Sequence, residues 1–184
     1  MWIINEDILL IKTWNELFKL IETTEGKVIG ELKLFDLVYF TDLDNGFVGN
    51  GIYIIKDENS IRYIGKASSR PFVERLGGHL DLREIGGFNN LLKSIVKKDL
   101  KKEECDESIA EAGRILMNYK LILICMEGKK GNSYQFEILE NILIDKYRNE
   151  NLLNKKYRLK KTYHEDGKIE DSIYRRVEEV ASIT

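Results

Sequence analysis

Apolar residues near the start of the chain recur at the spacing of an amphipathic helix. Thr13 stands just before them and Glu16 follows three residues later, which is the pattern of a helix-capping box. The residues that share the helical spacing are Trp14, Leu17, Phe18 and Ile21. The sequence therefore predicts a first helix that begins at Thr13.

A strand-like pattern follows after residue 50. Two runs rich in β-branched and aromatic residues, 51–56 and 61–65, flank the polar residues 57–60. This composition predicts two antiparallel strands joined by a hairpin loop. The preceding stretch 30–40 is densely apolar without a clean period, so a strand and an irregular packing segment are both open there. The turn residues of 42–49 predict a loop.

The remainder of the chain is typical of helices with one more strand. Pro71 suits the first turn of a helix in which Arg75 and His79, four residues apart, share a face. Gly77 and Gly78 each cost about 1 kcal/mol of helix propensity, so we expect this helix to be short or bent. The pattern further predicts helices over 88–100, 107–119, 132–147 and 169–180, the last a charged surface helix, and a strand over 121–126.

The composition describes one soluble domain. A chain of 184 residues, 43% apolar and 33% charged, can bury one good core. No apolar stretch approaches the roughly 20 residues that cross a bilayer, and the first residues lack the basic leader of a signal peptide. Cys105 and Cys125 stand in unlike surroundings without metal-ligand spacing, which favours a reducing, cytoplasmic location.

The charges are unevenly distributed along the chain. A formal net charge of -2 argues mildly against a polyanionic partner. The segment before Gly51 is acidic, however, whereas basic residues cluster within 93–102 and 155–161. Such clusters are often only solvated helix faces, so they indicate nucleic-acid binding only where they lie near a site. The candidates for contact with DNA are Lys93, Lys97, Lys98, Lys155, Lys156 and Arg158.

One carboxylate falls on an apolar helix face. Glu140 lies on the stripe of the helix expected over 132–147, whereas Glu137 lies on its flank. The stripe consists of Phe136, Leu139, Leu143 and Tyr147. A carboxylate directed at a core is costly unless it is paired with a cation or binds a metal. Both explanations are open for Glu140.

Taken in order, these residues resemble the GIY-YIG nuclease family. The matching residues are Gly51-Ile52-Tyr53, Tyr63-Ile64-Gly65-Lys66, Arg75 with His79, Glu140, and Asn154. Either tripeptide alone would be weak evidence, because such residues are common in strands. The chain departs from the shortest family members by extra length between His79 and Glu140. It also has Asn149-Glu150-Asn151 where the family has a proline, which leaves Asn151 open beside Asn154.

The resemblance implies a metal and a phosphate site. Glu140 would bind Mg²⁺ or Mn²⁺, since these hard cations take carboxylate oxygens and keep several waters. Lys66 and Arg75 would hold the phosphate, the guanidinium with two parallel hydrogen bonds. Asn154 completes the set of candidate catalytic residues.

The resemblance also implies a proton path. Tyr53 is the family's general base, Tyr63 would position the water or the base, and His79 would relay a proton or orient the phosphate. A free phenol, with a pKa of about 10, is a poor base at pH 7. The role therefore requires neighbouring cations such as Lys66 and Arg75 to lower the pKa of Tyr53.

The resemblance and the element order together predict an α+β domain. A small three-stranded, mainly antiparallel sheet would be flanked by helices. Residues 50–155 would form the nuclease core, with an insertion at about 84–118. Residues 1–49 would be a helical N-terminal extension packed on that core, and residues 156–184 a charged C-terminal tail or helix.

The expected activity is metal-dependent hydrolysis of DNA phosphodiester bonds. Restriction or defence is the expected role, because the chain lacks the further domains of repair members of the family. Two alternatives are open: a DNA- or RNA-binding module that keeps the fold without cutting, and a scaffold protein that uses the acidic N-terminal segment. A homodimer is also open, because a duplex cutter needs two active sites or two visits.

Overall fold

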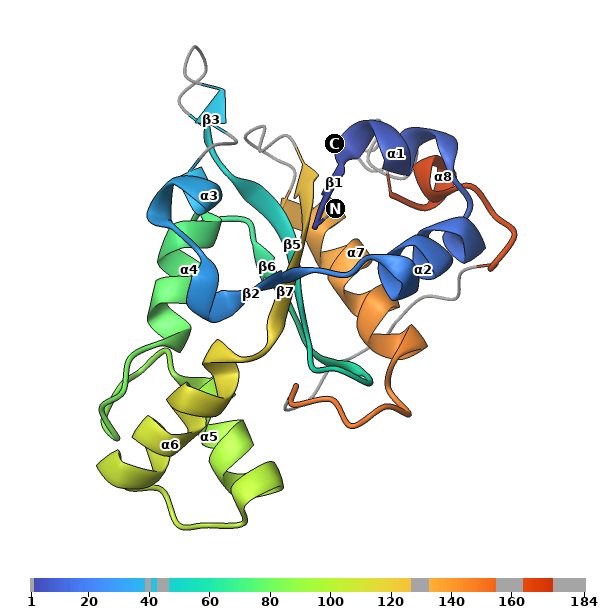
Figure 1. Cartoon of the computed structure of the whole chain (residues 1–184). Helices are drawn as coiled ribbons and strands as arrows, with labels where there is room; N and C mark the ends of the chain where they lie inside the picture. Colours follow the sequence, from blue (N-terminus) through green and yellow to red (C-terminus); the bar gives the residue numbers. More distant parts are fainter. Residues whose placement is uncertain (1, 39–40, 43–46, 127–132, 155–163, 174–184) are drawn as a thin grey trace, which may run out of the picture.

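The computed structural model describes residues 2–38, 41–42, 47–126, 133–154 and 164–173. Within them the chain has the predicted α+β fold, with helices on both faces of a mixed sheet (Figure 1). The strands are β1 (Ile3–Asn5), β2 (Lys27–Val28), β3 (Thr41–Asp42), β4 (Phe47–Val48), β5 (Asn50–Lys56), β6 (Ile61–Ala67) and β7 (Lys120–Met126). The helices are α1 (Glu6–Ile11), α2 (Trp14–Thr23), the 3₁₀ turn η1 (Ile29–Glu31), α3 (Leu34–Val38), α4 (Phe72–His79), α5 (Asn90–Ile95), the π-helical η2 (Val96–Leu100), α6 (Asp106–Met117), α7 (Ser133–Lys146) and α8 (Ile169–Ile173). None of the helices in this part of the chain combines the length and the apolarity that a membrane crossing requires.

The predicted hairpin forms the centre and one edge of the main sheet. β5 pairs antiparallel with β6 on one side and with β7 on the other, so that Tyr53 lies opposite both Gly65 and Leu123. Among the described residues the strand order is β1-β7-β5-β6, with β2 also paired to β7. β6 is therefore an edge strand.

Four strands that the sequence pattern did not indicate come from the N-terminal segment: the short antiparallel pair β3 and β4, and two that join the main sheet. β1 runs parallel to β7, with Ile3 opposite Leu123, and β2 runs antiparallel to it, with Lys27 opposite Leu121. The described part of the sheet thus has five strands where the sequence predicted three. Strands of three and two residues are too short for an alternating pattern to be recognised.

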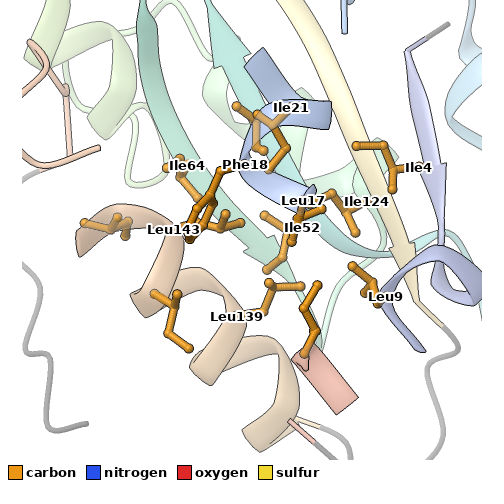
Figure 2. Close-up of a cluster of buried hydrophobic side chains, with 14 of the residues drawn as sticks. Ile4, Leu9, Leu17, Phe18, Ile21, Ile52, Ile64, Ile124, Leu139 and Leu143 are labelled. Carbon is orange, nitrogen blue, oxygen red and sulfur yellow. The ribbon is translucent and has the colours of Figure 1, made fainter. Parts of the chain in front are cut away.

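The sheet is buried on both faces because successive strand residues point to opposite sides. Ile52, Ile54 and Ile64 form one core with residues of α1, α2, α7 and α8 (Figure 2). Tyr53 and Ile55 face the other way, into a core completed by α4, α5 and α6. This double burial explains why the first hairpin strand is apolar without alternation.

The first helix begins as the capping box predicts. The backbone N–H of Thr13 donates to the Glu16 carboxylate at 2.8 Å, and the Thr13 hydroxyl accepts from the Glu16 N–H. The apolar stretch 30–40, as far as it is described, is irregular: it consists of η1 and the short α3. Residue 132, where the helix over 132–147 was expected to begin, lies outside the described residues.

The described start of the helix expected over 169–180 contributes to the core. Here α8 packs against α1 and α7 with both Ile169 and Ile173 fully buried. Two isoleucines four residues apart lie on one helix face, and this face covers the core instead of facing solvent. The residues from 174 onwards lie outside the described part.

We predict opposite effects for two glycine substitutions. Gly51 has a φ of 143°, and a Cβ at this position would lie 1.9 Å from the carbonyl oxygen of Ile124, so Gly51→Ala is expected to cost about 3–5 kcal/mol of stability. Gly77 lies in α4 with open space at the Cβ position, so Gly77→Ala is expected to stabilise the protein by up to about 1 kcal/mol. Urea unfolding measures both changes. Equal stabilities for the two variants would contradict the described backbone at Gly51.

Candidate active site

The candidate catalytic residues meet around the edge strand β6. They are Tyr53 on β5, Tyr63 and Lys66 on β6, Arg75 and His79 on α4, and Glu140 on α7. The tyrosines lie in the layer between the sheet and α4. Lys66 lies three residues after Tyr63, so its side chain is on the opposite face of β6, where it contacts Glu140 on α7. Residues almost 90 positions apart in the sequence thus share one site.

Tyr53 and His79 form the buried centre of this site. The Tyr53 hydroxyl lies 2.8 Å from His79 Nε2, and both side chains are buried. The Tyr63 ring stacks on Tyr53 at 6.0 Å between centroids and meets the His79 ring edge-on at 5.3 Å. The edge of Phe72 packs against Tyr53 from a further side. These ring contacts hold the hydroxyl and the imidazole together.

Gly65 makes room for the Tyr53 ring. A Cβ at Gly65 would lie 2.3 Å from the phenol ring of Tyr53, which crosses over this strand position. The missing side chain at Gly65 therefore lets the Tyr53 ring pack against β6.

The expected lowering of the Tyr53 pKa does not occur in this structure. Burial raises the pKa of Tyr53 above its ordinary value, and the neighbouring Tyr63 and the Glu140 carboxylate raise it further. Arg75 opposes them but does not outweigh them. The phenol therefore stays protonated at neutral pH and cannot act as a preformed phenolate.

His79 provides the proton acceptor that Tyr53 needs. Burial lowers the pKa of His79 to about 4, the Arg75 guanidinium lowers it as well, and the backbone of Phe88 opposes both. At neutral pH the imidazole is neutral, and in the tautomer that carries its proton on Nδ1 the Nε2 atom can accept the proton of the Tyr53 hydroxyl. The pair is a proton donor and a neutral acceptor.

Glu140 on α7 lies beside Lys66 of the edge strand. Its side chain keeps 19% exposure against 58% for Glu137, and Lys66 Nζ lies 3.5 Å from the former carboxylate and 3.7 Å from the latter. Burial raises the pKa of Glu140, whereas Lys66 and Arg75 lower it. Because Glu140 also raises the pKa of Tyr63, its charge acts inside the aromatic cluster. Glu140 is therefore both paired with a cation and accessible.

Asn154 positions the edge strand β6, and its expected place in the catalytic set stays a prediction. Its side-chain oxygen accepts from the Ile64 N–H at 3.1 Å, and its side-chain nitrogen donates to the Ile64 carbonyl at 2.7 Å. The amide thus pairs with the open edge of β6 as another strand would. Asn151, the alternative, is exposed. These contacts assign the matching position to Asn154.

A cavity of about 340 Å³ opens beside the cluster. Tyr63, Arg75 and His79 line it together with Arg70 and Phe88, two residues that no sequence pattern had indicated. The Arg75 Nε also donates to the Lys66 carbonyl at 3.2 Å, which fixes the guanidinium between β6 and the cavity. Arg70 is paired with Glu74, which also lines the cavity, so Arg75 is the guanidinium best suited to a phosphate.

The predicted DNA-binding lysines are less well placed. Asn90 at the start of α5 lines the cavity, but Lys97 and Lys98 lie in η2 at the far end of the same helical segment. Lys98 donates to the Leu152 carbonyl, and Lys93 lies 3.9 Å from Glu104, while Lys97 is exposed. Lys155, Lys156 and Arg158 lie outside the described residues.

Comparison of the chain with protein-family models, with curated proteins and with solved structures gives no match.

We predict that Asn154→Ala destabilises the protein. The change removes two hydrogen bonds from the Ile64 backbone, so the expected loss of unfolding free energy is about 1–3 kcal/mol. Asn151→Ala is the matched control, and as an exposed residue it should change stability by less than about 0.5 kcal/mol. Chemical denaturation compares them. The positioning role would be refuted by an Asn154→Ala variant as stable as its control.

We predict a pH dependence of stability that disappears with His79. A histidine whose pKa is lowered in the folded state binds its proton only on unfolding, so stability is lost as pH falls from about 6.5 toward 4. The contribution of His79 to this loss is on the order of 3 kcal/mol at pH 4. His79→Gln should show a correspondingly shallower decline than the wild type in unfolding curves measured between pH 7 and pH 4. Parallel declines would mean that His79 is not held neutral.

Proposed function

We propose that this protein is a metal-dependent endonuclease that hydrolyses DNA phosphodiester bonds in the manner of the GIY-YIG nucleases it resembles. The observation that carries the proposal is the joining of three groups in one site. The buried Tyr53–His79 pair lies beside the cavity that Arg75 lines. The accessible Glu140 carboxylate raises the pKa of Tyr53, and Arg75 lowers it. Binding alone would not require a buried proton donor and acceptor beside a carboxylate.

Glu140 would hold the Mg²⁺ or Mn²⁺ ion. Within the described residues no group of three or more His, Cys, Asp or Glu side chains is arranged to hold a metal. Mg²⁺ does not need such a group, since it is commonly bound by one or two carboxylates with waters and substrate oxygens. The Glu140 carboxylate fits, because it is partly exposed and has Glu137 one turn away. A bound cation would offset the phosphoryl charge and orient the attacking water.

Arg75 would bind the phosphate. Its Nε is occupied by the Lys66 carbonyl, which leaves the two terminal nitrogens of the guanidinium for phosphate oxygens. Arg70 lines the same cavity, where its charge is shared with Glu74 at 3.0 Å. Arg75 is therefore the principal anion ligand, with Arg70 at the rim.

The aromatic cluster would take the proton of the attacking water. The Tyr63 ring stacks on Tyr53, and the Tyr53 hydroxyl in turn faces His79 Nε2. Tyr63 lines the cavity, so a proton can pass from water through Tyr63 and Tyr53 to the neutral imidazole. The water oxygen then forms a bond to phosphorus, one ester bond breaks, and the leaving oxygen takes a proton from solvent. His79 is the final base, and Tyr53 a relay.

We predict that Glu140→Gln and Tyr53→Phe each reduce DNA cleavage by about 100-fold or more. The first removes the charge that would hold the cation, and the second removes the hydroxyl between Tyr63 and His79 while keeping the ring contacts. Nicking of supercoiled plasmid with Mg²⁺ or Mn²⁺ measures both. Glu111→Gln, on α6 and paired with Lys102, is the matched control and should cut at the wild-type rate.

Three outcomes decide between the functions. Cleavage that depends on Glu140 and Tyr53 supports the nuclease. Salt-sensitive DNA binding with no cleavage over a range of metals and sequences would replace the proposal with the non-cutting nucleic-acid-binding module. Absence of both binding and cleavage would leave the scaffold protein.

A further inference from the structure

The loop between α4 and α5 presents apolar side chains to solvent beside the cavity. Ile85 is 88% exposed, Phe88 53% and Leu82 48%. Single exposed apolar residues are common, but three of them within seven positions of one loop form a patch of the kind that marks an interaction surface. In Figure 1 this loop is the green segment that leads from α4 to α5.

Hydrogen bonds fix the backbone of this loop. The buried Asn89 amide donates to the carbonyls of Asp81 at 2.9 Å and Arg83 at 2.6 Å. The Glu84 N–H donates to the Asp106 carboxylate on α6 at 2.7 Å. A loop that is tied down at three places holds Ile85 in solvent at a defined position, so little conformational entropy remains to be lost on binding.

Phe88 connects the exposed patch to the cavity. Its ring lines the cavity, and the Arg70 guanidinium lies over it at 4.8 Å from the centroid. Gly78 lets Phe88 pack closely against α4, since a Cβ at Gly78 would lie 3.2 Å from the Phe88 Cβ. Phe88, Arg70 and Arg75 thus line one cavity.

We infer that this loop binds nucleobases of the DNA strand whose phosphate enters the cavity, with Phe88 stacking on a base and Ile85 contacting the next. The inference rests on the proposed function for the identity of the strand. A polynucleotide offers an anionic phosphate and an apolar base face side by side, which matches Arg75 and Arg70 beside Phe88. Every base can stack on an aromatic side chain, and apolar side chains can also be inserted between base steps.

The test measures binding of oligonucleotides that contain 2-aminopurine to the full chain in EDTA, where metal-dependent cutting is absent. Phe88→Ala and Ile85→Ser should each weaken binding by about tenfold and abolish the change in 2-aminopurine fluorescence. Phe88→Trp, which restores a stacking face, should bind like the wild type. Ile11→Ser is the matched control, because Ile11 is 75% exposed on α1, away from the cavity.

The outcomes separate this inference from the nuclease proposal. If Phe88→Ala and Ile85→Ser retain their melting temperature and bind DNA as tightly as the control, the loop is not a base-binding surface, whether or not the protein cuts DNA. If they bind weakly and the wild type never cuts, the loop contact stands and the nuclease proposal fails. Wild-type protein that binds no oligonucleotide overturns both and leaves the patch to a protein partner.

Discussion

The unpaired edge of β6 is the constraint on which the site depends. The outward N–H and C=O groups of an edge strand need partners, or they invite pairing with another chain. Here the Asn154 amide satisfies Ile64, the Leu153 N–H donates to Arg62, and Arg75 donates to Lys66. The groups that complete the sheet are therefore the groups that shape the site. Arg75, the candidate phosphate-binding residue, is therefore held in place by a contact that also completes the sheet.

Burial at the centre of the cluster keeps the Tyr53–His79 pair uncharged. It raises the pKa of the Tyr53 phenol and lowers that of the His79 imidazole, so both stay neutral at pH 7. A preformed phenolate would repel the nearby Glu140 charge and any entering phosphate. A neutral pair avoids this cost and still offers a proton acceptor.

Local patterns in the sequence predicted the local features of the fold. The Thr13 capping box, the hairpin and the placement of Glu140 follow from spacings of a few residues and were all expected. Pairing of β1 and β2 with β7 depends on contacts between distant residues, which single-sequence periodicity does not contain. The same holds for the burial of α8 and for Asn154, whose partner lies 90 positions away. Burial of Tyr53, which reverses the expected pKa shift, was likewise visible only in three dimensions.

A crystal structure of the protein with Mn²⁺ and a nucleoside monophosphate tests the central claim most directly, since Mn²⁺ is located by its anomalous scattering. One active site for phosphodiester hydrolysis predicts a single strong peak in contact with the Glu140 carboxylate and a phosphate within hydrogen-bond distance of the Arg75 guanidinium. Mn²⁺ bound away from Glu140, with the phosphate remote from Arg75, would contradict it.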